Sequence, residues 1–305
     1  MYNVYPVSEI SLMAASILSN CPDGKIGTIH SVFNSSCNIK LTEGPILTIQ
    51  TAKVAKTPMS LCLPQLGDIY SLSFKPGEPV FFNSVTNGLK IGGNSFFLRD
   101  AQKFSTYISI KKHEIKIADY KTSLGIFFQQ KPAKLYDIIM GDASENITPI
   151  EKALANEISK ALNISKQGFL NQDENLIVTG ISKLLGLGMG LTPSGDDLLL
   201  GFLTILSIKK NYSIMIENIK HQILGIAKKS TTEISCEFIN YFFKHNFAMP
   251  VFHLIVALNE DNLVLFEKSL PIISSIGHSS GQDFLTGLFF GLDFFEGNIS
   301  SANVN

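Results

Sequence analysis

The motif TPSGDDLLLG at residues 192–201 recurs as HSSGQDFLTG at residues 278–287, which is 86 residues further along the chain. The two copies share the pattern Ser-Gly-x-Asp-x-Leu-x-Gly. A Ser followed three residues later by Asp, ahead of an apolar run, is typical of a helix start, because the Ser oxygen accepts from a first-turn N–H and the Asp reaches back. The sequence therefore predicts two related helices, beginning near Ser194 and Ser280.

The shared glycines predict that the two helix starts lie side by side. Gly201 and Gly287 sit inside apolar helical stretches, where Gly costs ~1 kcal/mol relative to Ala. A close helix–helix or helix–ligand approach would explain why the cost is tolerated twice. Paired helix N-termini offer N–H donors and positive dipole ends, so they are suited to a small anion. The alternative is that both motifs only keep helix ends from fraying.

Composition limits the classes of partner. The chain has 305 residues, enough for two domains and a large core. Its formal net charge of −1 gives no support for a nucleic-acid partner. Its apolar runs are far shorter than the ~20 residues of a membrane span. The four cysteines form no CxxC pair, which indicates reduced thiols and a cytoplasmic protein.

The expected fold class is α+β, with a β-rich domain at 1–130 and a helical domain at 131–305. Short strand-like runs alternate with turn signals in the first part, which favours a small barrel or sandwich. Asn87-Gly88, between two apolar runs, predicts a hairpin. A short helix is expected near 8–18. From 131 onward the apolar period is helical, and helices are predicted at 133–140, 149–162, 174–185, 194–209, 214–228, 231–245, 251–258, 261–275 and 280–295.

The densest candidate site is the glycine-rich segment 186–197, GLGMGLTPSGDD. It is not a dinucleotide loop, because GxGxG lacks the GxGxxG spacing and a helical segment precedes it. Nor is it a triphosphate loop, because Asp196 stands where a phosphate-binding Lys belongs. The segment instead predicts a backbone-rich loop that delivers N–H groups to a helix start. The candidate substrate-binding residues are Gly188, Gly190, Thr192, Ser194, Gly195, Asp197, Ser279, Ser280, Gly281 and Asp283.

Asp196 and His278 are the candidate catalytic residues. Asp196 aligns with Gln282, so the repeat does not need its carboxylate, which is therefore assigned to orienting a substrate amide. His278 immediately precedes a helix start, where it can donate a proton or bind substrate. Capping is the more ordinary role for Asp197 and Asp283. A hard cation held by the three aspartates is an alternative, but no metal and no cofactor are expected.

The segments 188–203, 231–235 and 276–283, with Gly287, resemble the DUF2877 family, which includes the AllH-type subunit of oxamate carbamoyltransferase. The resemblance extends over residues 182–292. It implies carbamoyl transfer between oxalurate and phosphate, giving oxamate and carbamoyl phosphate, in anaerobic use of allantoin nitrogen. It also implies a complex of several subunits, and it assigns no catalytic residue. The chain has Met189 at a position where the family frequently has Pro.

Two other functions remain open from the sequence. The first alternative is a non-catalytic scaffold or regulatory subunit whose motifs are structural caps. The second is a standalone enzyme that acts on another small carboxylate. The chain lacks an HExxH motif and a nucleotide loop. We therefore expect a chain that binds a small anionic substrate and works with other subunits of a transferase complex.

Overall fold

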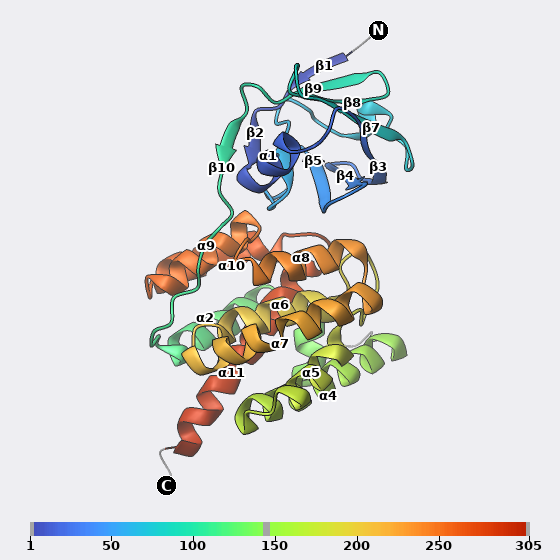
Figure 1. Cartoon of the computed structure of the whole chain (residues 1–305). Helices are drawn as coiled ribbons and strands as arrows, with labels where there is room; N and C mark the ends of the chain where they lie inside the picture. Colours follow the sequence, from blue (N-terminus) through green and yellow to red (C-terminus); the bar gives the residue numbers. More distant parts are fainter. Residues whose placement is uncertain (1–2, 143–146, 303–305) are drawn as a thin grey trace. The chain divides into compact units, whose positions relative to one another are not determined.

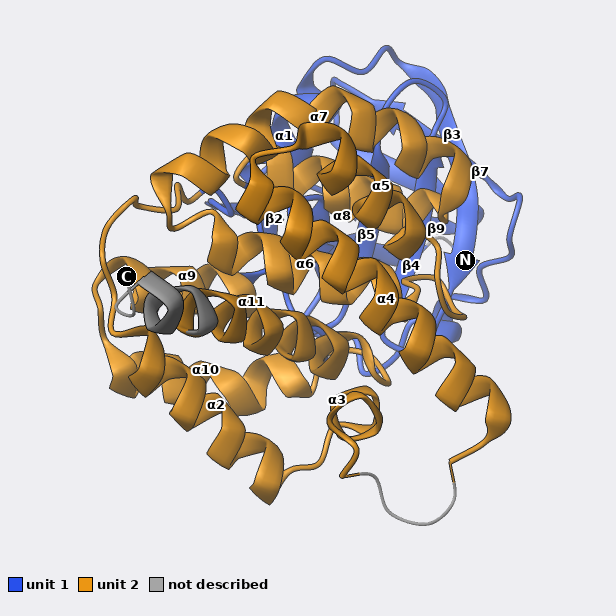
Figure 2. Cartoon of the chain, turned by 90° about the horizontal axis from the view of Figure 1, so that it is seen from below, with its two compact units in different colours: residues 1–107, 246–249 blue, residues 108–245, 250–305 orange. Residues whose placement is uncertain are grey.

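The computed structural model describes residues 3–142 and 147–302, with strands first and helices afterwards (Figure 1). The chain separates into two compact units (Figure 2). Unit 1 contains residues 1–107 and 246–249, and unit 2 contains residues 108–245 and 250–305. The architecture is the predicted α+β class, a β-rich half followed by a helical half.

Unit 1 is a ten-stranded sheet that curls into a half-barrel (Figure 1). The strand order is β1-β9-β8-β7-β3-β4-β5-β6-β2-β10. Strands β1 and β2 are separated only by Val7 and Ser8 but lie near opposite ends of this order, so the sheet has to curl to bring its ends together. The strands are β1 Asn3–Pro6, β2 Glu9–Ser11, β3 Gly24–Val32, β4 Ser36–Leu41, β5 Ile46–Gln50, β6 Ser60–Cys62, β7 Pro79–Asn83, β8 Gly88–Ile91, β9 Asn94–Phe97 and β10 Gln102–Phe104.

The Asn87-Gly88 hairpin is confirmed. Strands β7 and β8 pair antiparallel with Asn83 opposite Gly88, and Asn87 has φ +46°, a conformation that Asn tolerates better than most residues. The short helix expected near 8–18 is α1, Leu12–Ser19, which Ser11 caps by accepting from the N–H of Ala14. The sequence predicts strands at 27–33, 46–51, 59–63, 79–85, 89–91 and 95–98. It predicts none at β1, β2, β4 or β10, since their short runs carry polar residues that are also typical of turns.

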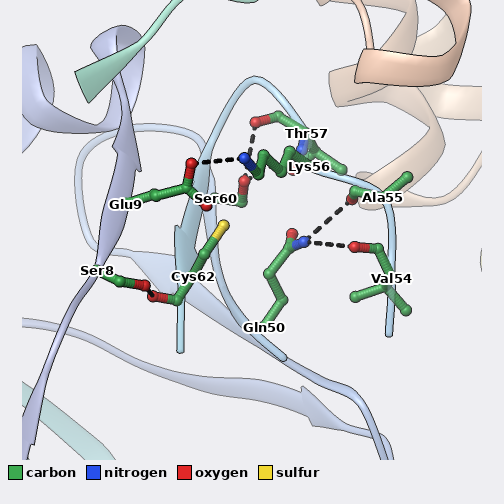
Figure 3. A network of polar contacts seen from close by, with 9 residues as sticks. All are labelled: Ser8, Glu9, Gln50, Val54, Ala55, Lys56, Thr57, Ser60 and Cys62. Atoms are coloured by element: carbon green, nitrogen blue, oxygen red, sulfur yellow. Dashed lines mark hydrogen bonds and ion pairs between the residues drawn. The ribbon is translucent and has the colours of Figure 1, made fainter. Parts of the chain in front are cut away.

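A polar network fixes the connection between β5 and β6 (Figure 3). These strands are parallel, so the chain must cross over between them. The side chain of Gln50, 1% exposed, donates to the carbonyls of Val54 and Ala55 at 3.0 and 3.1 Å. Lys56 pairs with Glu9 on β2 at 2.6 Å. These contacts satisfy polar groups that the crossover would otherwise bury unpaired.

Unit 2 is helical. Its helices are α2 Ile117–Gln130, α3 Lys134–Met140, α4 Pro149–Asn171, α5 Glu174–Leu184, α6 Ser194–Leu206, α7 Lys210–Ser230, α8 Glu233–Phe243, α9 Met249–Asn259 (whose first residue belongs to unit 1), α10 Leu263–Ser274 and α11 Ser280–Ala302. No helix of the described part of the chain is long and apolar enough to cross a membrane.

Helix α2, Ile117–Gln130, lies inside the range 1–130 that the sequence assigned to the β-rich domain. Its buried residues Ile117, Tyr120, Leu124 and Phe128 follow helical spacing, a signal that the strand interpretation overlooked. The predicted domain limit at 130 falls at the end of this helix, inside unit 2. The ranges 1–130 and 131–305 stay a prediction about domains.

The predicted close approach of the two glycine-bearing helices is confirmed. A Cβ atom on Gly201 would lie 1.9 Å from the carbonyl oxygen of Phe284 in α11, and one on Gly287 would lie 1.8 Å from that of Leu198 in α6. Such distances leave no room for a methyl group. The glycine of each helix therefore allows close packing against the backbone of the other helix, and this packing brings the starts of α6 and α11 together.

Candidate functional site at the paired helix starts

The residues at the starts of α6 and α11 are joined through hydroxyl groups. Thr192 Oγ1 and Ser280 Oγ lie 2.7 Å apart, one from each copy of the motif. This confirms that the two helix starts lie side by side. The contacts of Gly201 with Phe284 and of Gly291 with Ile205 continue in the same chain direction, so the helices run parallel and both positive dipole ends point to one place.

The structural repeat is larger than the motif and includes the preceding loops. The N–H of Gly195 donates to the carbonyl of Leu187 at 2.8 Å, and the N–H of Gly281 donates to that of Ile276 at 3.1 Å. These two N–H groups are thus already bonded inside the chain. The prediction that the motif glycines offer N–H groups to an anion is wrong for this conformation. Their smallness matters instead, because a Cβ on Gly195 would lie 2.2 Å from the carbonyl oxygen of Leu184.

The expected capping boxes do not form within α6. The N-cap residue is Pro193, it has no side-chain cap, and Ser194 is the first helical residue. The serines and aspartates instead pair across the two helices. Asp197 is hydrogen-bonded to hydroxyls that include Ser280 of α11, and Asp283 to hydroxyls that include Ser194 of α6. The side chains of the motif therefore connect the two helices.

Asp197 and Asp283 contribute a pair of carboxyl groups whose Oδ2 atoms are both buried, although Asp197 as a whole residue is half-buried. Asp283 is 4% exposed, and burial raises its pKa to about 6, against the opposing hydrogen bonds of Ser194 and Ser279. Burial, followed by the charge of Asp283, raises the pKa of Asp197 well above its ordinary value. Two carboxylates that share one poorly hydrated space cannot both ionise without a large cost.

Each carboxyl group of the pair also has an oxygen without a partner. Oδ2 of Asp197 and Oδ2 of Asp283 are buried and make no hydrogen bond to any residue that the structure describes. Unsatisfied buried polar atoms are uncommon in folded proteins, and their explanations include strain, a catalytic role and an ordered water or ion. The pair is therefore the part of the site with unused hydrogen-bonding capacity.

The side chain of Asp196 does not belong to this carboxyl pair. It is fully buried, and its Oδ1 accepts from the N–H of Gly186 at 2.8 Å. Its Oδ2 accepts from Ser235 Oγ at 2.7 Å and from the hydroxyl of Thr231. The carboxylate thus joins the start of α6 to the α5–α6 loop and to the start of α8. In this conformation it has no surface to offer a substrate, although the sequence assigned it a catalytic role.

Asp196→Asn is expected to destabilise the fold by about 1–3 kcal/mol, because an amide nitrogen would face a donor where the carboxylate now accepts. Urea unfolding of the variant and the wild type measures the difference. Asp100→Asn, an exposed site in unit 1, is the control and should change little. A variant of unchanged stability that has lost ligand binding would instead favour the catalytic assignment.

The remaining candidates lie in the loops that precede α6 and α11. His278 is exposed in the loop before α11. Gly188 and Gly190 have φ +123° and +98°, and Met189 between them is 88% exposed. Within residues 3–142 and 147–302, no three acidic, His or Cys side chains form a group that could hold a metal ion. Asp196 does not complete a cation site with the pair, because both its oxygens are used by neighbours.

The sequence did not identify Thr231 and Ser235 as the partners of Asp196. Their segment, 231–235, was recognised as part of the family resemblance, but adjacent hydroxyls before an apolar run are typical of helix caps. Thr232 is in fact the N-cap of α8, accepting from the N–H of Ser235 at 3.1 Å. Only the packing of α8 against α6 shows which hydroxyls reach the aspartate.

The fold and the site define a two-part α+β chain whose helical half carries a duplicated helix start. The family model described as oxamate carbamoyltransferase subunit AllH matches residues 184–292, from the end of α5 into α11. A model of the AllH family N-terminal domain matches residues 8–103. Together the two models match most of the chain, and the chain belongs to the AllH family. No solved structure matches it.

Proposed function

We propose that this chain is a subunit of a carbamoyltransferase that interconverts oxalurate plus phosphate and oxamate plus carbamoyl phosphate. The observation that carries the proposal is the position of the AllH match, which spans both helix starts and the loops that precede them. The proposed role is anaerobic assimilation of allantoin nitrogen in the cytoplasm, and the proposed substrate site is the pair of helix starts.

The chemistry of this site suits carbamoyl transfer. Oxalurate, oxamate and carbamoyl phosphate are small anions, and the positive ends of two parallel helices favour anions. The hydroxyls of Thr192, Ser194, Ser279 and Ser280 supply donors around the buried carboxyl pair. Donors held in place before reaction stabilise the charge of a tetrahedral intermediate at the carbamoyl carbon.

Individual roles follow from position. We assign proton transfer to Asp197 and Asp283, since a carboxyl group with a raised pKa can act as an acid near neutral pH. His278, in the exposed loop, is proposed to bind the substrate carboxylate or to carry a proton. Asp196 is proposed as a positioning residue that holds the α5–α6 loop.

A non-catalytic scaffold is the second candidate. The reciprocal Ser–Asp pairing across α6 and α11 would also stabilise the packing of these two helices without any catalytic role. Activity in the assembled complex separates the two, because a scaffold tolerates substitutions at the site that leave the fold intact.

The test is co-expression of this chain with the products of neighbouring genes, followed by an assay of phosphate-dependent oxalurate cleavage. We expect the complex to be active and the chain alone to be a poor catalyst, since positioning becomes effective once a partner encloses the site. Ser194→Ala with Ser280→Ala should lower kcat about 100-fold or more. Ser275→Ala, an exposed serine in the same loop, is the matched control.

Two outcomes would count against this proposal. Full activity of the purified chain would contradict the need for partner subunits. A complex that keeps its kcat with both site serines replaced would place the chemistry elsewhere and favour the scaffold role.

A further inference from the structure

We propose that Asp197 and Asp283 together hold the –CO–NH2 group of the ligand, one carboxyl accepting from its N–H and the other donating to its carbonyl oxygen. The inference rests on the proposed function and specifies which end of the substrate enters the buried pair. It selects ligands with a primary amide or a terminal ureido group over ligands that have only carboxylate groups.

The first support is the hydrogen-bonding capacity that the fold leaves unused. Oδ2 of Asp283 is buried without a partner in a residue only 4% exposed, and Oδ2 of Asp197 is its counterpart from the other half of the repeat. The other hydrogen bonds of both groups go to hydroxyls of the same motifs. Each of the two carboxyl groups thus has one oxygen whose hydrogen-bonding capacity the described chain does not use.

The second support is the charge state that such a pair must adopt. Two adjacent buried carboxyl groups retain one proton, because their negative charges repel each other in a space that water does not screen. A singly protonated pair presents one O–H donor and one carboxylate acceptor. A primary amide presents the complement, with N–H donors and a carbonyl acceptor, whereas a carboxylate presents acceptors only and brings a like charge.

The third support is the placement of donors for the other end of the ligand. Thr192 and Ser280 lie beside Asp197, and Ser194 and Ser279 lie beside Asp283, at the positive ends of two helices. The loops before these helices carry the exposed residues His278 and Met189. The amide therefore enters the carboxyl pair, and the carboxylate or phosphate end faces the hydroxyls and the loops.

The test compares oxamate with pyruvate in calorimetric titrations of the full chain and of its complex. The two ligands have the same charge and nearly the same shape, and they differ in –NH2 against –CH3. We expect oxamate to bind at least about 10-fold more tightly, because a site built around hydrogen bonds rejects an analogue that lacks them. Asp283→Ala should abolish this preference.

Asp197→Asn provides a sharper comparison. An Asn side chain keeps an N–H donor where the protonated carboxyl donates, so this variant should keep its preference for oxamate within about threefold. Asp197→Ala should lose it, and Asp100→Ala, in an exposed position of unit 1, should leave it unchanged. Circular dichroism melting of each variant verifies folding, and the wild-type comparison decides the matter if a variant does not fold.

Equal affinities of the wild type for oxamate and pyruvate would overturn the inference and leave the proposed function in place. A preference that survives Asp283→Ala in a folded variant would overturn it as well. If neither ligand binds to the chain or to the complex, both the inference and the proposed substrate site are wrong.

Discussion

Asp283→Asn is expected to raise the free energy of unfolding at pH 7.5 by about 1–3 kcal/mol. Burial raises the pKa of this carboxyl from 3.8 to about 6, so its ionised form is disfavoured in the folded state. At pH 7.5 the buried ionised carboxylate destabilises the folded wild type, whereas a neutral Asn does not carry this charge. Asn also keeps an oxygen that can accept from Ser194 and Ser279, the two hydroxyls beside Asp283.

The pH dependence gives the prediction its sign. The folded chain holds the Asp283 proton more tightly than the unfolded chain, so this group contributes stability at low pH that is lost as the pH rises from about 4 through about 6. The advantage of Asn should therefore be small at pH 4 and reach its full size above pH 7. Urea unfolding at pH 4, 5, 6 and 7.5 measures it, with Asp100→Asn as the exposed control.

A capping role for Asp283 makes the opposite prediction. Loss of a helix cap costs ~0.5–2 kcal/mol, and Asn itself is a good cap, so the variant would be neutral or less stable at every pH. A variant less stable than the wild type at pH 7.5 would therefore contradict the prediction that the ionised carboxylate of Asp283 destabilises the folded state. A stable variant with altered ligand binding is typical of a residue kept for function at some cost in stability.

Gly201→Ala and Gly287→Ala are each expected to destabilise the fold by about 3 kcal/mol or more. The added methyl group would lie within 1.9 Å of a backbone carbonyl oxygen of the facing helix, and backbone atoms cannot move aside as a side chain can. Relief would require α6 and α11 to separate along their packed length. The same separation would disturb the Thr192–Ser280 contact, so ligand binding should fall together with stability.

Gly225→Ala is the matched control, since Gly225 lies inside α7 and a Cβ there would meet nothing within 4 Å. That variant should gain about 0.5–1 kcal/mol, the ordinary benefit of Ala over Gly in a helix. Thermal unfolding of the three variants provides the comparison. Equal effects at all three positions would mean that the glycines in α6 and α11 are not required by the helix crossing.

The sequence alone predicted the order of the fold and the location of the candidate site. Periodicity of apolar residues separated a β-rich half from a helical half, and Asn87-Gly88 specified its hairpin, because these signals act between neighbouring residues. The duplicated motif predicted two helix starts, and its glycines predicted their close approach, since a close crossing explains why the ~1 kcal/mol cost of Gly in a helix is tolerated at both positions.

Only the tertiary structure decided what each aspartate faces. Asp196 and Asp197 are adjacent, and successive residues of a helix point about 100° apart, so one carboxyl meets α8 while the other meets α11. No local pattern shows which neighbour lies on which side. The sequence assigned catalysis to Asp196 and substrate binding or capping to Asp197. In the structure the oxygens of Asp196 are used by neighbouring groups, whereas Oδ2 of Asp197 has no partner among the described residues.

The same reason explains the hydrogen bonds of the helix starts. A Ser-x-x-Asp pattern predicts a bond within one first turn, but a second helix start brought alongside offers each side chain a partner from another part of the chain. The N–H groups of Gly195 and Gly281 likewise pair with carbonyls of their own loops. Sequence determined which residues have hydrogen-bonding capacity, and packing determined which of them still have it in the folded chain.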